Sequence, residues 1–220
     1  MLQERPWVPA ASETRVQDIA RWTESQDSAA VADRIVKEDA PGNVATHMGG
    51  GSSILQVDTA SGTVVKDRFR LFDIAWRVNE GFQRHVGARW AAPAGGTHHY
   101  AHVKGVHRVY QKVNRAYKGR LARVLDVVRT TVTFDDLDAL TDCLEAISSD
   151  RAVSVLRVKN RYSPAYDSLD GYRDVSLLVV GAEVTGGFVC EVQLNLSAMY
   201  AAKSSGGHRR YILARDARGD

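Results

Sequence analysis

Cysteine is scarce in this chain of 220 residues, which has only Cys143 and Cys190. Cys143 lies in a predicted helix and Cys190 in a predicted strand, so we expect two buried free thiols rather than a disulfide. No cysteine and histidine cluster has the ligand spacing of a zinc site. These absences favour a reducing, cytoplasm-like compartment, although a toxin secreted by another export route stays compatible with them.

Long apolar runs are also missing. No segment approaches the roughly 18 apolar residues of a membrane span, and the first ten residues, MLQERPWVPA, lack the apolar core of a signal peptide. We therefore expect no membrane partner and a cytoplasmic location, with a secreted effector as the alternative. Internal repeats and low-complexity segments are absent as well.

A strong charge excess is lacking, since the net charge is +3 and the isoelectric point about 8.9. Such mild basicity suits an anionic ligand such as a nucleotide, but by itself it does not indicate a nucleic-acid binder. The 44% hydrophobic and 25% charged residues are ordinary for a soluble protein with a real core. The length fits one domain with an accessory segment.

The accessory segment is predicted over residues 1–96 and is mainly helical. Ser12 or Thr14 could cap a helix that runs to about Arg34, and a second helix is expected over 66–90. The glycine-rich stretch 48-MGGGSSIL-55 has no Lys-Ser/Thr after it and no clear strand before it. It is therefore interpreted as a connection rather than a phosphate-binding loop.

Helices and strands alternate over residues 97–220. Helices are predicted over 103–118, 136–148 (capped by Asp135 or Asp136) and 197–203, and strands over 123–134, 152–161, 172–180 and 188–196. The last two strands should form a hairpin through Gly186 and Gly187. This order predicts an α/β (α+β) fold, a mixed sheet flanked by helices.

Two carboxylates interrupt apolar strands. Asp126 stands in the Val/Leu-rich run RVLDVVRTTVTF, and Glu191 is the only acidic residue of FVCEVQLNL. An ionised aspartate inside a strand is costly unless it is paired or bound to a cation. Together the two carboxylates could hold one Mg²⁺ that also bridges phosphates. Glu191 could equally lie on a solvated face.

Cations recur on two elements. Lys104, Arg108 and Lys112 are spaced i, i+4, i+8 on one face of the helix predicted over 103–118, and Arg115 extends the stripe. The strand over 152–161 places Arg157, Lys159 and Arg161 on one face. Either set could be a solvated surface or could hold phosphates. Two carboxylates between two cationic surfaces resemble a nucleotide site.

The order of the motifs resembles the synthetase domain of the RelA/SpoT family over about residues 97–213. Four pieces carry the resemblance: 102-HVKGVHRVYQKV-113, 125-LDVVRTTVTFDDLDAL-140, 159-KNRY-162 followed by 171-GYRD-174, and 190-CEVQLNLSAM-199. The family is similar to nucleotidyltransferases in fold, and its members make the alarmones ppGpp and pppGpp. The GYRD and EVQLNL forms look like a divergent branch, similar to domains of toxins and of larger multidomain proteins.

The resemblance implies roles for single residues. Asp126 and Glu191 would bind Mg²⁺, and Glu191 would help to deprotonate the acceptor 3′-hydroxyl. The ATP-binding residues would be Lys104, Arg108, Lys112 and Arg129, and the acceptor-binding residues Lys159, Arg161, Tyr172, Gln193 and Asn195, with Tyr172 stacking on the guanine. The implied reaction moves the β,γ-pyrophosphate of ATP onto the 3′-hydroxyl of GDP or GTP.

Several positions depart from the usual family pattern, and Arg173 and Asp174 stand where smaller polar residues are common. His102 stands in place of an arginine, Ser176 in place of a histidine that contacts the acceptor, and Asn195 in place of an arginine. The acceptor could therefore be an adenine nucleotide or the 3′ end of tRNA, or the domain could be a non-catalytic nucleotide binder. No His-Asp hydrolase pattern is present, so alarmone hydrolysis is not expected. A homo-oligomer and an antitoxin-type protein partner both remain open.

Overall fold

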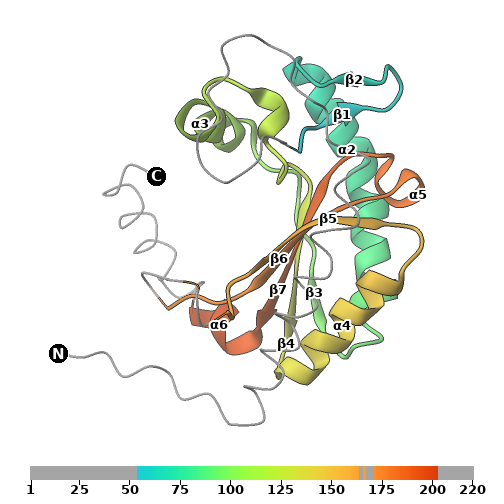
Figure 1. Cartoon of the computed structure of the whole chain (residues 1–220), viewed down its shortest axis with the longest axis vertical. Coiled ribbons are helices and arrows are strands. Elements are labelled where there is room, and N and C mark those ends of the chain that lie inside the picture. Colours follow the sequence, from blue (N-terminus) through green and yellow to red (C-terminus); the bar gives the residue numbers. More distant parts are fainter. Residues whose placement is uncertain (1–53, 164–165, 167–170, 203–220) are drawn as a thin grey trace, which may run out of the picture.

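The computed structural model describes residues 54–163, 166 and 171–202. A five-stranded sheet in the order β3-β4-β7-β6-β5 forms its centre (Figure 1). The strands are β3 (Thr97–His99), β4 (Arg129–Phe134), β5 (Ser154–Asn160), β6 (Val175–Val180) and β7 (Cys190–Leu196). Only the β4–β7 pair is parallel within this sheet. The predicted mixed sheet is thereby confirmed.

The predicted hairpin corresponds to β6 and β7, which pair antiparallel with Leu177 opposite Val192. A short helix, α5 (Ala182–Thr185), lies between the two strands. Gly186 and Gly187 follow it with φ of 57° and 76°. This left-handed backbone region is costly for side chains that carry a Cβ, so the glycine pair returns the chain into β7.

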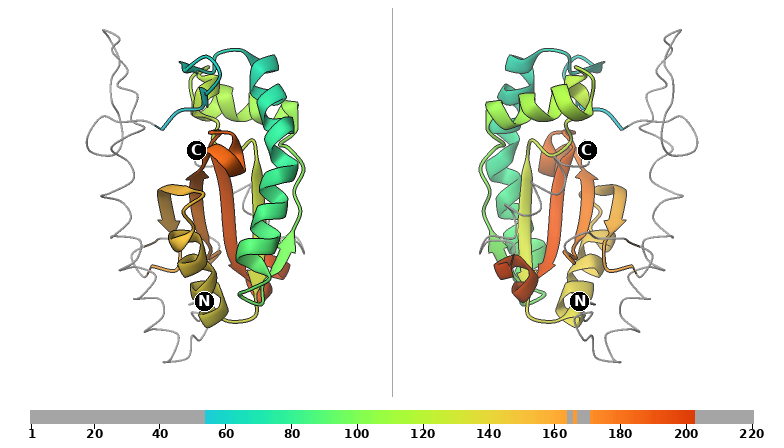
Figure 2. Two further views of the ribbon diagram at one scale, coloured as in Figure 1. Left: turned by 90° about the vertical axis from the view of Figure 1, so that its right-hand side faces the viewer. Right: turned by 90° about the vertical axis from the view of Figure 1, so that its left-hand side faces the viewer.

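Helices cover one face of the sheet. Figure 2 shows α2 (Arg68–His85) and α4 (Leu137–Ser149) on the same side of the strands, and no described helix lies over the strands on the opposite face. Alternate strand residues such as Val175, Leu177 and Val179 point to the helices and are fully buried. One face of the sheet thus carries the main core. The other face carries polar side chains and a smaller apolar cluster of Leu125, Leu156, Leu178, Val180 and Val189.

Local signals explain both helices. Asp67 accepts a hydrogen bond from Arg70 N at the start of α2, and Asp136 accepts one from Ala139 N at the start of α4. The structure confirms the helices predicted over 66–90 and 136–148, and it selects Asp136 as the cap. After α2 the chain continues as a π-helix, η2 (Val86–Ala91). A last helix, α6 (Ser197–Ala202), follows β7.

Residues before position 97 contribute to the main core. Phe82 and Trp90 belong to the same buried cluster as Val132 and Leu194 of the sheet. A small antiparallel hairpin, β1 (Val57–Asp58) and β2 (Thr63–Val64), precedes α2. The division into an accessory region over 1–96 and a synthetase domain over 97–220 stays a prediction.

Two sequence predictions need correction. The strand predicted over 123–134 begins only at Arg129, because a 3-10 turn, η3 (Leu121–Arg123), and an irregular stretch precede it. Asp126 therefore lies before the strand and not within it. The helix predicted over 103–118 is α3 (Val106–Ala116), so Lys104 precedes the helix and does not share its face with Arg108 and Lys112.

Cys143 and Cys190 are free and buried, as predicted. Among the helices of the described residues, none is long and apolar enough to cross a bilayer. The helix predicted from Ser12 or Thr14 and most of the glycine-rich stretch over 48–55 lie outside the described residues.

Candidate functional site

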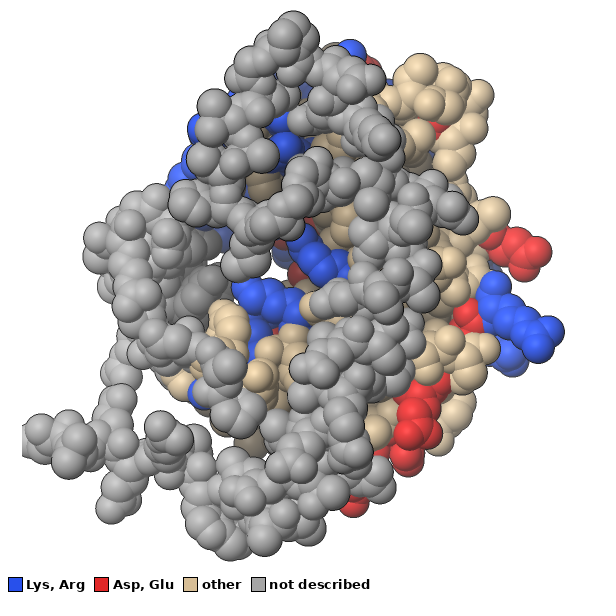
Figure 3. All heavy atoms as spheres, viewed as in Figure 1, with Lys and Arg blue, Asp and Glu red and all other residues tan. Residues whose placement is uncertain are grey.

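The candidate site lies on the face of the sheet opposite α2 and α4, at the strands β4, β7 and β6. Glu191 in β7 stands beside Arg129 of β4 and Leu178 of β6 in the strand register. Gln193, two residues further on the same face, is next to Ser176. Lysine and arginine side chains gather on this side of the molecule (Figure 3). The pleat of the sheet thus brings the polar residues of separate strands together.

Asp126 is the centre of an ion cluster. Its Oδ2 accepts from Lys104 Nζ at 2.5 Å and from Lys112 Nζ at 2.9 Å. The Asp126 and Lys104 side chains are only 13% and 10% exposed. Burial alone would raise the pKa of Asp126, but the two ammonium groups outweigh it, and the pKa lies below its ordinary value.

The two lysines respond differently to the same carboxylate. Burial lowers the pKa of Lys104, and the attraction of Asp126 offsets this only in part. Burial acts in the same direction on Lys112, but Asp126, Tyr117 and Glu191 together raise its pKa above the ordinary value. The charge of Glu191 contributes to this rise beside that of Asp126, which Lys112 contacts directly.

Glu191 is held by hydrogen bonds at both carboxylate oxygens. Ser176 Oγ donates to Oε1 at 2.9 Å, and Gln193 Nε2 donates to Oε2 at 3.3 Å. The backbone N–H of Glu191 donates to Val128 O at 3.0 Å, which ties the start of β7 to the stretch after Asp126. The Glu191 side chain is therefore oriented by its own strand and by β6.

The carboxylates fit a hard divalent cation. Asp126 Oδ1 is buried and has no hydrogen-bond partner within the described part of the chain. A carboxylate oxygen in that state is a suitable ligand for Mg²⁺. Among the described residues no group of three or more His, Cys, Asp or Glu side chains could hold a metal. Most ligands of a Mg²⁺ ion would then be water and phosphate oxygens, as is usual for this ion.

The other predicted ATP ligands lie at different depths. Arg108 is exposed on α3, where Nη1 donates to Gln111 Oε1 at 3.1 Å. Arg129 is half-buried beside Glu191, and its backbone carbonyl accepts from Gln83 Nε2 at 2.8 Å. The structure thus brings Lys104, Lys112 and Arg129 close to the carboxylates, whereas Arg108, one turn before Lys112 on α3, is exposed to solvent.

Three of the predicted acceptor residues, Arg161, Tyr172 and Asn195, form a second cluster around Asp174. The Tyr172 hydroxyl lies 3.0 Å from Asp174 Oδ2 and 2.6 Å from Asn195 Oδ1. Arg161 forms an ion pair with Asp174. Asn195 is fully buried, so it reaches this region only through the tyrosine hydroxyl.

Lys159 is the exposed member of this region. It stands beside Ser176 in the strand register, and its Nζ lies 5.4 Å from the centre of the Tyr166 ring. Arg161 Nε donates to the Tyr166 hydroxyl at 3.1 Å. Both basic side chains therefore lie close to one aromatic ring.

Sequence reasoning gave no role to Asp174, Tyr166 or the Ser176 hydroxyl. Asp174 is 1% exposed and directly precedes a strand of six buried residues. A buried carboxylate requires a partner. The place of Asp174 directly before an apolar strand was therefore the sequence signal that could have indicated its role. Tyr166 and Ser176 carry no such signal, because their contacts depend on the pairing of β5, β6 and β7.

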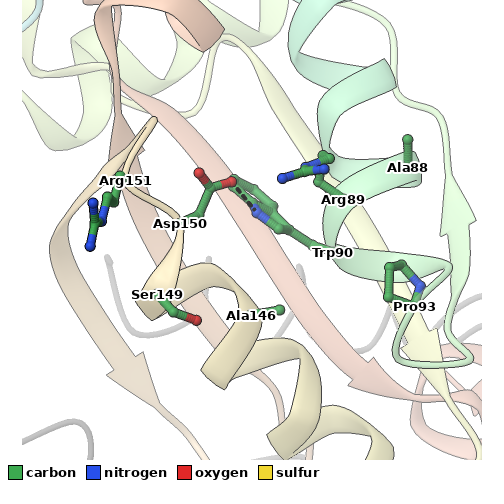
Figure 4. Close-up of a pocket in the computed structure, with 8 residues that line it drawn as sticks. All are labelled: Ala88, Arg89, Trp90, Pro93, Ala146, Ser149, Asp150 and Arg151. Carbon is green, nitrogen blue, oxygen red and sulfur yellow. Dashed lines mark hydrogen bonds between the residues drawn. The ribbon is translucent and has the colours of Figure 1, made fainter.

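A separate pocket of about 460 Å³ opens between η2 and the end of α4 (Figure 4). In it, Asp150 Oδ2 accepts from Trp90 Nε1 at 2.9 Å and lies 2.7 Å from His85 Nε2. The pocket contains none of the predicted site residues. It belongs to the helix-covered side of the sheet.

No family model matches this sequence, and no curated protein matches it. Solved structures do match. The small alarmone synthetase 1 from Bacillus subtilis bound to its product pppGpp has a TM-score of 0.53 at 15% identity, covering 65% of this chain and 80% of the other. A second structure of that protein has a TM-score of 0.52 at 15% identity, covering 69% and 81%.

A GTP pyrophosphokinase family protein from Streptococcus pneumoniae has a TM-score of 0.53 at 12% identity, covering 65% of this chain and 76% of the other. Identities this low carry information about the fold alone. The strand order, the helix-covered face and these likenesses lead to one conclusion: the chain has the mixed, nucleotidyltransferase-like fold of the small alarmone synthetases.

Proposed function

We propose that this protein is a Mg²⁺-dependent pyrophosphotransferase that moves the β,γ-pyrophosphate of ATP to the 3′-hydroxyl of a guanine nucleotide. The observation that carries the proposal is the ion cluster of Asp126, Lys104 and Lys112, together with Glu191, whose backbone N–H donates to Val128 O just after Asp126. Its support from outside the molecule is a fold similar to that of a synthetase bound to its product pppGpp.

The reaction joins the acceptor 3′-oxygen to the β-phosphorus of ATP and breaks the bond from that phosphorus to the oxygen that bridges to the α-phosphorus. AMP leaves with the electron pair of the broken bond, and the proton of the 3′-hydroxyl passes to a base. Glu191 is the proposed base, because its carboxylate is oriented by Ser176 and Gln193.

Asp126 Oδ1 and Glu191 would hold Mg²⁺, which when bound neutralises charge on the phosphate oxygens. Lys104 and Lys112 would donate to the polyphosphate. The ammonium groups of both lysines already contact the same oxygen, Asp126 Oδ2. Such preorganised cations stabilise the charge that develops in phosphoryl transfer. Arg129 and Arg108 are proposed to contact ATP more peripherally.

The acceptor would lie over β6 and β5, next to Lys159, Tyr172 and Gln193. Gln193 is half-buried and bonded to Glu191, so an acceptor that contacts its amide would have its sugar near the proposed base. Holding the 3′-oxygen close to the base in this way would accelerate the reaction, because the two groups are already positioned to react.

The experiment uses ATP labelled in the γ-phosphate, with Mg²⁺ and each of GDP, GTP, ADP, AMP and bulk tRNA as acceptor. Transfer of label to a guanine nucleotide, with release of AMP, is the expected result. Label on an adenine nucleotide or tRNA would keep the chemistry and change the acceptor.

Glu191→Gln tests the base against Glu183→Gln, which changes an exposed glutamate of α5. The first variant should lose at least about 100-fold in rate, since general bases contribute about 10²–10⁴-fold, and the second should retain the wild-type rate. Absence of product with every acceptor, in a folded protein, would refute the enzymatic proposal.

A further inference from the structure

Asp174 connects two residues that both belong to the proposed acceptor region. Its carboxylate is 1% exposed and directly precedes β6. Oδ1 pairs with Arg161 Nη1, and Oδ2 lies 3.0 Å from the Tyr172 hydroxyl. The backbone adds a further link, because Arg161 N donates to Asp174 O at 2.8 Å. One buried anion therefore holds a cation after β5 and an aromatic ring before β6.

The Arg161 guanidinium is engaged at two of its nitrogens, Nη1 and Nε. Nη1 binds Asp174, Nε donates to Tyr166, and the side chain is 20% exposed. Burial by itself lowers the pKa of Arg161, but Asp174 and Tyr166 raise it above the ordinary value. A phosphate that took Arg161 would leave Asp174 as a buried, unpaired charge, which is strongly unfavourable.

Tyr172 is fixed at its hydroxyl end by two partners. A phenol has one proton to donate, yet Asp174 Oδ2 and Asn195 Oδ1 both lie within hydrogen-bond distance. Asn195 Nδ2 is buried and has no partner within the described part of the chain. A reversed Asn195 amide would place a donor toward the tyrosine oxygen. The hydroxyl would then accept from Asn195 and donate to Asp174.

We propose that Asp174 is a positioning residue that withdraws Arg161 from phosphate binding and uses it to fix the Tyr172 ring. The phosphates of the acceptor would then be contacted by exposed Lys159 rather than by Arg161. The acceptor is consequently recognised mainly through its base, with only a shallow dependence of affinity on the number of phosphates. This inference rests on the proposed function. It gives Arg161 a structural role in place of the acceptor-binding role that the resemblance implied.

Calorimetric titrations test the proposal. Guanosine and adenosine mono-, di- and triphosphates are titrated into the full chain with Mg²⁺ and a non-hydrolysable ATP analogue. Arg161→Gln should weaken mono- and triphosphate by the same factor, about three- to tenfold, because the loosened ring must be ordered on binding. Lys159→Ala should weaken the triphosphate more than the monophosphate. Arg151→Gln, an exposed arginine far from the cluster, is the matched control.

Asp174→Asn supplies the opposite change. It releases Arg161, so the gain in affinity from mono- to triphosphate should become steeper than in the wild type. A loss on Arg161→Gln that grows with phosphate number would overturn the proposal, since Arg161 would then be a phosphate ligand. An unchanged phosphate dependence in Asp174→Asn would overturn it as well.

A readout without nucleotide separates this inference from the proposed function. Urea unfolding of Arg161→Gln, Asp174→Asn and the double variant should be strongly non-additive, because each single change leaves a buried partner unpaired. Additive losses would refute the link between Asp174 and Arg161. If no nucleotide binds to a folded wild type, the proposed function and the acceptor part of the inference both fail, whereas non-additivity would still establish the buried link.

Discussion

At the scale of single residues, the candidate site depends on Asp126, whose two carboxylate oxygens have different surroundings. Asp126 Oδ2 is saturated by Lys104 and Lys112, whereas Oδ1 is buried without a partner among the described residues. The lysines keep the carboxylate ionised in a poorly solvated place. Asp126 thus has one oxygen in contact with two ammonium groups, and the other oxygen is the one that we propose binds the metal ion.

Asp126→Asn should reduce pyrophosphate transfer by at least about 100-fold, because it removes a proposed metal ligand and the anion that gathers both lysines. It should also lower the free energy of unfolding, since two nearby ammonium groups lose their counter-charge. Steady-state rates and urea unfolding measure the two effects. Asp142→Asn, an exposed change on α4, should alter neither. Wild-type rates in Asp126→Asn would exclude this carboxylate from catalysis.

At the scale of elements, a helix cap and a small hairpin stabilise the elements around the sheet that carries the site. α4 begins at Asp136, which accepts from Ala139 N at 2.8 Å. The β1–β2 hairpin is fastened to α2 because Arg70 donates to Asp58 through Nε at 2.8 Å and Nη2 at 2.9 Å. Each of these contacts can be tested by a single change.

Asp136→Ala removes the helix cap of α4 and should lower the free energy of unfolding by about 1 kcal/mol, the usual value for such a cap. Chemical denaturation monitored by circular dichroism measures the change. Asp142→Ala on the same helix has no cap to remove and serves as the comparison. Equal stabilities of the two variants would show that this cap contributes nothing.

Asp58→Asn tests the fastening of the hairpin through its pH dependence. The hydrogen bonds from Arg70 outweigh the effect of burial and lower the pKa of Asp58 to about 2, below its ordinary value of 3.8. Between these values the unfolded chain binds more protons than the folded chain. The stabilisation is thus fully present above about pH 4 and is lost as the pH falls toward 2.

Urea unfolding of wild type and Asp58→Asn, compared at pH 6 and pH 3, measures this effect. The variant should be less stable at pH 6, and its deficit should shrink at pH 3. A deficit that is constant with pH would mean that the Asp58 charge has no part in fastening the hairpin.

At the scale of the whole molecule, one hydrophobic core joins segments far apart in the sequence. Phe82 of α2 is fully buried in the same cluster as residues of β4, β6 and β7. The sheet therefore depends on residues before position 97 for the cover of one face. This core decides how the strands present their polar side chains on the opposite face.

Phe82→Ala should destabilise the whole protein by about 3–5 kcal/mol, because it removes buried surface and leaves a cavity. Phe69→Ala is the matched control, since Phe69 on the same helix is 71% exposed and its loss should cost less than about 0.5 kcal/mol. Thermal and urea unfolding measure both. If Phe82→Ala were as mild as the control, α2 would not be part of the cooperative core.

Much of the fold was predictable because its signals are local. Alternating apolar residues specified strands β5 and β7, and a continuous apolar run specified β6. An aspartate before an apolar repeat specified the start of α4, at Asp135 or Asp136. The region around Asp126 was not predictable in the same way. Its Val/Leu-rich run has strand character, but the chain turns at Leu121–Arg123 and enters the sheet only at Arg129.

The sequence by itself determined the element types, the two carboxylates, the surrounding cations and two reduced, buried cysteines. Only the tertiary structure decided which cation meets which carboxylate. Lys104 and Lys112 lie on Asp126, whereas Arg161 lies on Asp174, a pairing that no spacing predicts. The physical reason is that these ion pairs join elements brought together by strand pairing and by the shared core, and neither is encoded within a single segment.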